Sequence, residues 1–563
     1  MPELGAAGSG PLVLGPVLRR VHADTATVWV ETASPAIVEV RATGGTGGGP
    51  GGSARTFSVH GHHYALVVVT GLPAAAVTPY QVLVDGVCCW PPPGDRFPAP
   101  MIRTRRPGAP VRLLFGSCRE STPQGTDRYP PDALDAYATR LAATRVAATA
   151  DGNAAPDGDY PEHWPDTLVL LGDQVYADQP PGAIRGWLSA RRVTHLPQAP
   201  SDQVADFHEY TRLYLDSWRD PELRWLLSTV PSVMIFDDHE IIDDWNSSEA
   251  WRAEATATPW WGDRIRAGLS SYWVYQHLGN LAPDGLAADP WYRAVADGGD
   301  VTDAMDALGA RADSDRTWYR WSYALDLDRT RLVVLDNRCA RRLDPGKRAM
   351  LPDSELDWLA GQLAGDVDHL AIGASLPWLM PPGIHHLEAI DELLSQSTRP
   401  RVARSAEQLR RWLDLEHWPA FGRSFETLGA MLGATGASAT APASISVLSG
   451  DVHHSYAARA DLGPGVRSAV HQLTCSPIHN AVPAVMRPAM RLGWHRGVAG
   501  LAAALARSVG VPPPEVRWRK LVGPVFGNAI GTLICTGRSA TATIETTTAD
   551  RTLVTVADLS LTG

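Results

Sequence analysis

The sequence has 563 residues, of which 44% are hydrophobic and 20% are charged, and its formal net charge is -11. This is ordinary globular composition, and the length allows a large catalytic domain with one or two smaller units. The acidic balance argues against binding through counterion release, so we expect no stable nucleic-acid partner. The six cysteines show no regular spacing, which argues against a disulfide scaffold or a CxxC zinc site.

The first residues, Met1 to Gly15, lack a basic segment followed by an apolar segment, so the sequence predicts no signal peptide. No stretch of the chain is apolar and long enough to span a bilayer. We therefore expect a soluble protein with a cytoplasmic location.

Residues 1–105 are predicted to form an all-β sandwich domain of the immunoglobulin or fibronectin type. The runs Thr25–Val30, Tyr64–Val69 and Tyr80–Asp85 are strand-like, and turn residues separate them at short intervals. The glycine-rich stretch Gly44–Gly52 lacks the Gly-Lys-Ser/Thr ending of a phosphate-binding loop, so we interpret it as a flexible hairpin loop. The proline-rich stretch from Pro91 to Pro110 indicates a linker after this domain.

Strands alternate with helical patterns in residues 106–563, which predicts an α/β domain with a β-sheet core flanked by helices. The helix candidates are Pro131–Ala148, Phe207–Trp218, Ile265–Tyr275, Ser354–Leu363 and Ala406–Leu415. Residues 427–442 are small, polar and glycine-rich, and we interpret them as a mobile surface insert. The tail, residues 531–560, returns to a β pattern.

Four polar motifs each follow a short, mostly apolar run. The motifs are Gly116–Arg119, Gly172–Asp178, Asp237–Glu240 and Gly450–His454, and the runs before them are Val111–Phe115, Thr167–Leu171, Ser232–Phe236 and Ser444–Leu448. Such runs are typical of strands buried on both faces. Because a parallel sheet brings the loops at the carboxyl ends of its strands to one edge, we expect the motifs to meet there. The sequence therefore predicts a site for two metal ions.

The second and third motifs offer carboxylates with useful neighbours. Asp173 and Tyr176 can place a carboxylate and a phenolate on one ion, and the carboxylate can bridge to a second ion. Asp238 offers another carboxylate, and its neighbour His239 is free to donate a proton. Taken alone, each motif is also compatible with a solvated surface turn.

The fourth and first motifs complete the candidate set. Asp451 and His453 are two residues apart on an extended segment and share a face, which favours His453 over His454. Cys118 follows a strand end like the other candidates, although a buried, inert cysteine is the alternative. A thiolate with a phenolate suits Fe(III), whereas carboxylates and phosphate oxygens suit Ca(II).

In their order and wording, the four motifs resemble the alkaline phosphatase D (PhoD-like) family of metallophosphoesterases, over about residues 12 to 560. The resemblance implies hydrolysis of phosphomonoesters and phosphodiesters by a metal-activated hydroxide at an Fe(III)–Ca(II) site. It implies these residues as metal ligands: Cys118, Asp173, Tyr176 and His453 for iron, and Asp173, Asp238 and Asp451 for calcium. His239 is the expected general acid. Purple acid phosphatases share the Gly-Asp-x-x-Tyr element, which supports Tyr176.

Arginines are the expected contacts of the phosphate. The segment Asp336-Asn337-Arg338 resembles an Asp-Thr-Arg element of the family, with Asn337 in place of threonine. Arg338 is therefore expected at the phosphate, where a guanidinium can bind two oxygens at once, although a structural salt bridge is equally open. Arg119 and Arg341 are further substrate-contact candidates. Asp243, Asp244 and Asn246 either support the site or cap a helix.

Residues 487–520 interleave arginines with apolar residues, a basic amphipathic pattern. Such a segment can be a lid over the site, a weak contact with anionic membranes, or a helix packed on the core.

Several functions stay open beside the phosphatase. They are a nuclease or phospholipid hydrolase on the same centre, a zinc or manganese phosphoesterase, and a non-catalytic binding protein with an inactive metallophosphatase-like domain. The intact set of predicted ligands argues against the last of these.

Overall fold

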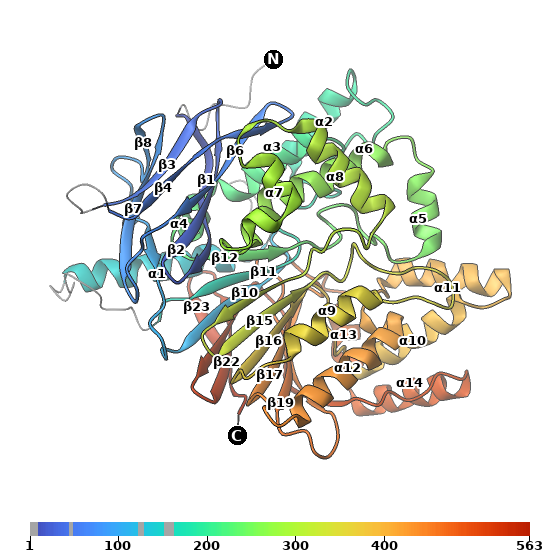
Figure 1. Cartoon of the computed structure of the whole chain (residues 1–563). Helices are drawn as coiled ribbons and strands as arrows, with labels where there is room; N and C mark the ends of the chain where they lie inside the picture. Colours follow the sequence, from blue (N-terminus) through green and yellow to red (C-terminus); the bar gives the residue numbers. More distant parts are fainter. Residues whose placement is uncertain (1–9, 44–48, 122–128, 151–162, 563) are drawn as a thin grey trace.

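The computed structural model describes residues 10–43, 49–121, 129–150 and 163–562, and its architecture is mixed α/β with four β-sheets (Figure 1). The expected combination of sheets and helices is therefore confirmed. Of the glycine-rich loop predicted between the first strands, residues 44–48 lie outside the described residues.

The amino-terminal region is all-β, and two of the sheets lie in it. Its strands are β1 (Leu12–His22), β2 (Thr25–Thr32), β3 (Ile37–Ala42), β4 (Gly51–Arg55), β5 (Phe57–Val59), β6 (His62–Val69), β7 (Val77–Val84), β8 (Val87–Trp90) and β9 (Met101–Arg103). One sheet has the order β1-β2-β6-β5-β13 and the other β4-β3-β7-β8. Alternate valines such as Val28, Val38 and Val67 fill the core between them, as strand periodicity requires.

This region is tied to the rest of the chain by buried contacts. The short strand β13 (Gly299–Asp300) belongs to the later sequence and pairs with β5. Arg19 on β1 donates from Nη2 to the carbonyl of Gln276 at 2.7 Å and to Asn280 at 3.0 Å. Figure 1 shows the blue amino-terminal strands beside the green helical part of the chain.

Two mixed sheets form the centre of the molecule. The first contains β10 (Val111–Gly116), β11 (Thr167–Leu171), β12 (Ser232–Ile235), β21 (Ala529–Thr536), β22 (Ser539–Thr547) and β23 (Leu553–Ser560). The second contains β14 (Tyr323–Leu327), β15 (Thr330–Leu335), β16 (His369–Ala374), β17 (Ser444–Ser449), β18 (Ser455–Asp461), β19 (Ala469–Thr474) and β20 (Arg517–Val525). Leu171 of the first sheet packs against Gly373 of the second.

Each sheet combines a block of parallel strands with antiparallel strands beside it. β10, β11 and β12 pair in parallel, and so do β15, β16, β17 and β19. Every residue of β11, β12, β16 and β17 is buried, which explains why these strands are short apolar runs without alternation. The expected single parallel sheet is therefore wrong, because the four motifs are divided between two facing sheets.

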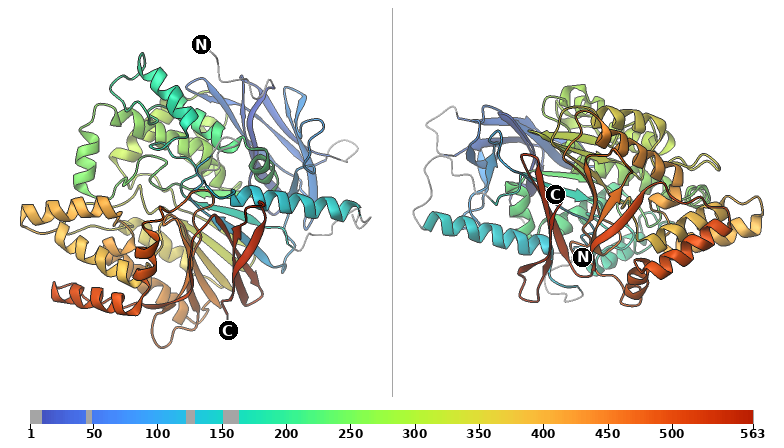
Figure 2. Two further views of the ribbon diagram at one scale, coloured as in Figure 1. Left: turned by 180° about the vertical axis from the view of Figure 1, so that it is seen from behind. Right: turned by 90° about the horizontal axis from the view of Figure 1, so that it is seen from below.

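Helices cover the outer faces of this sandwich (Figure 2). They are α1 (Ala133–Ala150), α2 (Gly182–Arg192), α3 (Phe207–Trp218), α4 (Pro221–Thr229), α5 (Glu249–Thr256), α6 (Trp261–Tyr272), α7 (Pro290–Val295), α8 (Thr302–Ser314), α9 (Asp353–Leu363), α10 (Pro382–Ser395), α11 (Pro400–Leu413), α12 (Gly422–Ala437), α13 (Arg487–Gly493) and α14 (Arg496–Ser508). The predicted helix Phe207–Trp218 agrees with α3 at both ends. At its amino end, the Asp206 side chain accepts from the Glu209 backbone.

Two predictions about single segments need correction. Residues 427–442 are not a mobile insert, because most of them form α12, which buries Phe425, Leu428 and Leu432 against the second sheet. The spacing of these residues is helical, and the many glycines obscured it. Residues 487–520 are not one helix. They form α13, which ends at Gly493, α14, which ends at Ser508, and the start of β20 at Arg517.

None of the helices in the described part of the chain is long and apolar enough to cross a bilayer.

Candidate metal centre

The four sequence motifs meet at one end of the central sandwich. Cys118 follows β10, Asp173 follows β11, Asp238 follows β12, and Asp451 follows β17. The first three come from one sheet and the fourth from the other. The site therefore lies where the carboxyl ends of parallel strands in both sheets converge, which is where α/β proteins bind ligands.

One group of donors combines sulfur, oxygen and nitrogen. Cys118, Asp173 and His453 each offer one ligand atom, and these atoms lie within 4.8 Å of one another. The Tyr176 hydroxyl lies 3.4 Å from Asp173 Oδ2 and accepts from Asn480 Nδ2 at 3.0 Å. The structure thus brings together all four residues that the sequence predicts as iron ligands.

A second group consists of carboxylates. Asp173, Asp237, Asp238 and Asp451 also have ligand atoms within 4.8 Å of one another. Three of these are the predicted calcium ligands, and Asp237 is an addition that sequence reasoning missed. Asp173 belongs to both groups, so its carboxylate lies where a bridge between two ions would have to be.

The backbone at this end of the sandwich is held in an uncommon conformation. Cys118, Asp173, Asp451 and His453 all have positive φ, between 49° and 65°. Non-glycine residues in the left-handed region are rare, and they cluster at functional sites where the surrounding structure fixes them. Asp451 and His453 are therefore not on an extended strand as predicted, although His453 does join the cluster.

Two glycines allow the loops to approach each other. A Cβ on Gly172, whose φ is +103°, would lie 2.6 Å from Asp237 Cβ. A Cβ on Gly450 would lie 1.9 Å from Ser117 Oγ, the atom that accepts the backbone hydrogen bond of Asp451. Glycine fits both positions because the side chains of Asp237 and Ser117 leave no room for a Cβ.

The carboxylates repel one another in a buried site. Burial raises the pKa of Asp173 well above its ordinary value, and Asp237, Asp238 and Glu240 raise that pKa further. Burial likewise raises the pKa of the Cys118 thiol well above its usual range, and Asp173 adds to this effect. Asp173 Oδ1 and Asp237 Oδ2 are buried without a hydrogen-bond partner. A buried acceptor without a partner costs free energy, and a bound metal cation would remove that cost. These carboxylate oxygens therefore fit metal cations as ligand atoms.

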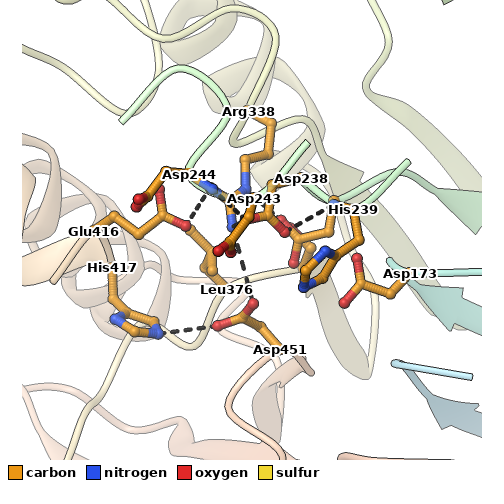
Figure 3. Close-up of polar contacts among 12 residues, drawn as sticks. Asp173, Asp238, His239, Asp243, Asp244, Arg338, Leu376, Glu416, His417 and Asp451 are labelled. Carbon is orange, nitrogen blue, oxygen red and sulfur yellow. Dashed lines mark hydrogen bonds and ion pairs between the residues drawn. The ribbon is translucent and has the colours of Figure 1, made fainter. Parts of the chain in front are cut away.

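Arg338 lies inside the acidic cluster (Figure 3). Its side chain is fully buried and forms ion pairs with Asp237 and Glu416, and it lies 3.4 Å from Asp238 Oδ2 and 3.9 Å from Asp451 Oδ1. Of the two alternatives left open by the sequence, this geometry favours a structural ion pair. A fully buried guanidinium that joins carboxylates on several loops holds those loops together.

The other two arginines expected at the phosphate are also paired inside the protein. Arg119 donates to Asp132 at 2.7 Å and to the carbonyl of Ser217 at 2.8 Å. Arg341 donates to Glu416 Oε2 at 3.1 Å and is fully buried. The geometry does not support a phosphate contact for either residue, since reaching the site would break buried ion pairs at a cost of several kcal/mol.

His239 is oriented by a carboxylate. Its Nδ1 lies 2.9 and 3.0 Å from the two oxygens of Asp178, and its ring lies 4.6 Å from that of Tyr176. Burial lowers the pKa of His239, but Asp178 and Asp238 outweigh this effect and hold the pKa well above its usual value. The bond to Asp178 fixes the ring through Nδ1, and one ring nitrogen lies within 4.8 Å of ligand atoms of Asp173 and Asp238.

Buried groups around the ligands hold the loops in place. Glu240 accepts from the backbone N–H groups of Asp173 at 3.0 Å, Gln174 at 2.8 Å and Asp237 at 2.8 Å, so one side chain ties the loops after β11 and β12 together. Asp244 donates its backbone N–H to Asp238 Oδ2 at 3.0 Å. The segment after His239 therefore supports the site, and α5 is capped instead by Ser248.

Comparison with known proteins agrees with this geometry. The fold and the donor set together define a metal-dependent hydrolase of phosphate esters. The model of the PhoD-like phosphatase family matches residues 158–489, and the chain belongs to this family. A domain family of unknown function, DUF7800, matches residues 9–102. No curated protein matches the chain.

Two solved structures were found to resemble the chain. A structure described as "Structure of PhoD" shares 13% identity with a TM-score of 0.57, covering 99% of this chain and 95% of its own. The purple acid phosphatase PPD1 from yellow lupin (Lupinus luteus) seeds shares 10% identity with a TM-score of 0.45, covering 97% of this chain and 74% of its own. The first likeness supports the PhoD-like fold.

Proposed function

We propose that this phosphatase hydrolyses phosphomonoesters and phosphodiesters at a centre of two metal ions. Cys118, Asp173, Tyr176 and His453 would hold one ion, and Asp173, Asp238 and Asp451 the other. The observation that carries the proposal is the position of Asp173, whose buried carboxylate belongs to both donor groups and has an oxygen without a protein partner. When bound, the ions would supply charge for the phosphate and acidify a water.

The donor types support a choice of ions for the two positions. A thiolate and a phenolate on one ion favour Fe(III), and an all-carboxylate set favours Ca(II). Zinc or manganese in these positions is the alternative, and it would leave the reaction class unchanged. Burial of Cys118 and Tyr176 raises the pKa of both groups, so a strongly charged ion is needed to hold them deprotonated.

The protein's own groups would position the ester and protonate the leaving group. His239, held through Nδ1 by Asp178, would donate from Nε2 to the leaving alkoxide as general acid. Arg338 would act from within the site by holding Asp237, Asp238 and Asp451 at their distances. Since the predicted arginines are all paired, the charge on the phosphate would be met chiefly by the ions.

The proposal is tested by measuring metal content and activity on the same preparations. The wild-type protein is expected to contain two metals per chain by elemental mass spectrometry and to hydrolyse nitrophenyl phosphate or bis-nitrophenyl phosphate. Asp173→Ala should lose both metals, because it removes the shared ligand. His239→Gln should keep the metals and slow esters with poor leaving groups most. Full turnover by Asp173→Ala would contradict the proposal, and a wild-type protein that binds no metal would favour the binding-protein alternative.

A further inference from the structure

Helix α14 packs through small side chains and leaves its larger apolar side chains outside. Its buried residues are Ala502 and Ala506, on the side that meets α10. Val498, Leu501 and Leu505 are exposed, with 73% of Leu501 and 49% of Leu505 accessible to solvent. These three residues share one face of the helix because they are three and four positions apart. A surface helix normally turns such a face to the core, so this stripe lies uncovered.

The apolar surface continues onto the neighbouring helix. Val485, Met486 and Leu492, on and just before α13, are exposed, and Val485 is 83% accessible. Helix α14 lies at the outer edge of the molecule in Figures 1 and 2. Single exposed apolar residues are common, whereas a group of this kind marks a contact surface.

The same part of the chain is strongly basic, in contrast to the net charge of -11 of the whole. Residues 485–525 contain one acidic residue, Glu515, and these basic residues: Arg487, Arg491, Arg496, Arg507, Arg517, Arg519 and Lys520. All of the basic residues except Arg487 are exposed, and none pairs with a carboxylate within the part of the chain that the structure describes. Their charge is therefore available to an anionic partner.

This surface adjoins the metal centre. Arg491 lies over the ring of Phe526 at 5.1 Å, and Phe526 in turn lies 5.9 Å from the ring of His454. Trp494, at the end of α13, packs on Tyr456 with ring centroids 5.2 Å apart. His454 directly follows the metal-ligand candidate His453, so the basic and apolar surface begins beside the site.

We propose that the α13–α14 surface, formed by Val485, Met486, Leu492, Val498, Leu501, Leu505, Arg491, Arg496 and Arg507, docks on an anionic phospholipid bilayer. Apolar side chains would enter the interface while arginines contact lipid phosphates. A second copy of the chain fits less well, because a symmetric contact would bring the same unpaired arginines together. Nucleic acid would use the arginines but would leave the exposed leucines uncovered.

Vesicle flotation tests the proposal with the full chain. The wild-type protein should float with vesicles of phosphatidylcholine and phosphatidylglycerol and not with phosphatidylcholine alone. Raising the salt from roughly 0.1 M to roughly 0.5 M should weaken binding, since screening shortens the reach of the arginines. Leu501→Ser with Leu505→Ser, and separately Arg496→Gln with Arg507→Gln, should each weaken binding at least about tenfold.

Matched controls lie elsewhere on the surface. Val193→Ser removes a comparably exposed apolar side chain and Arg293→Gln an exposed arginine, and both variants should bind vesicles like the wild type. Hydrolysis of a soluble nitrophenyl ester should be unchanged in all variants, and vesicle binding does not depend on turnover. The proposal is overturned if the wild type ignores anionic vesicles or if the leucine variant binds them fully. It is also overturned if the leucine variant instead converts a dimer to a monomer by light scattering, or if an oligonucleotide binds this surface in preference to vesicles.

Discussion

His417 joins the metal-ligand candidate Asp451 to a second buried carboxylate. Its Nε2 lies 3.0 Å from Asp451 Oδ2, and its Nδ1 lies 3.0 Å from Glu388 Oε1. Burial alone would raise the pKa of Asp451, but His417 and Arg338 hold that pKa at about 2. The carboxylate is therefore kept ionised and oriented by an imidazole that does not itself belong to the predicted ligand set.

Replacing His417 should loosen this arrangement. We expect His417→Gln to fold and to lose metal affinity or activity by about 10- to 100-fold, the usual effect of removing a partner of a metal ligand. The measurement is retained metal after dialysis, together with kcat at saturating metal. His369→Gln is a matched control, because His369 is also buried and hydrogen-bonded through both ring nitrogens, to Ser444 and Gly537. His369 is the first residue of β16, whereas the site lies at the carboxyl ends of the parallel strands. Equal metal loss in His417→Gln and His369→Gln would contradict a positioning role for His417.

Substitution of Glu240 should reduce metal binding as strongly as substitution of a metal ligand, although Glu240 is not one of the predicted ligands. Glu240→Gln turns an amide N–H₂ toward backbone donors that the carboxylate now accepts, so at least one buried N–H loses its partner at a cost of about 1–3 kcal/mol. The loops carrying Asp173 and Asp237 should then separate, and bound metal should fall. The measurements are metal content and the unfolding midpoint.

A second buried glutamate separates positioning from stability. Glu209 is also buried, accepts from the Ala205 backbone at 2.7 Å and pairs with Arg192, but lies outside the donor groups. Glu209→Gln should lower the unfolding midpoint and leave metal content intact. If Glu240→Gln lowers the unfolding midpoint but leaves metal content intact, as Glu209→Gln should, then Glu240 stabilises the fold and does not position the metal site.

Gly450 allows Asp451 to reach the cluster only because it lacks a side chain. Gly450→Ala would place a Cβ 1.9 Å from Ser117 Oγ and 2.2 Å from Ser117 Cβ. We expect this change to cost about 1–3 kcal/mol of stability and to abolish most metal binding. Because the clash is with a side chain, adding Ser117→Gly should restore part of the metal binding. A double variant no better than Gly450→Ala would show that the clash is not the cause.

The sequence predicted much of the fold because each element carries its own local pattern. β11 and β17 are short apolar runs, and their bounds agree to within one residue with the predicted Thr167–Leu171 and Ser444–Leu448. Helix α12 was missed because glycine and alanine dominate it, so its apolar spacing is carried by few residues. The division of the strands between two sheets was also missed, since strand periodicity does not say which sheet a strand joins.

The metal-ligand candidates were predictable because each directly follows a strand. Glu416 and His417 were not, because they lie in the connection after α11, where no strand end or motif marks them. Arg338 was assigned to the phosphate because its segment resembles a family element, and only the packing shows it enclosed by Asp237 and Glu416. Contacts between segments distant in sequence thus account for what sequence reasoning missed.

His277 does not belong to the donor groups and should make the fold sensitive to acid. It is buried, its Nδ1 has no hydrogen-bond partner, and its ring packs on Trp321 with centroids 5.0 Å apart. Burial, with a smaller contribution from Arg19, lowers the pKa of His277 to about 3. The folded protein therefore keeps this imidazole neutral over a pH range in which the unfolded chain protonates it.

The sign of the effect follows from proton linkage. Below the unfolded pKa of about 6.5, the unfolded state binds a proton that the folded state refuses, so the free energy of unfolding falls as the pH drops toward 3. The loss is about 1.4 kcal/mol per pH unit, or roughly 2 kcal/mol at about pH 5. His277→Phe removes this term, so its urea midpoint should fall less between about pH 7.5 and about pH 5 than that of the wild type. Trp321→Phe is the control, because it disturbs the same packing without removing a titrating group, and it should shift the urea midpoint equally at both pH values. If His277→Phe and the wild type respond to pH in the same way, His277 is not a source of the acid sensitivity.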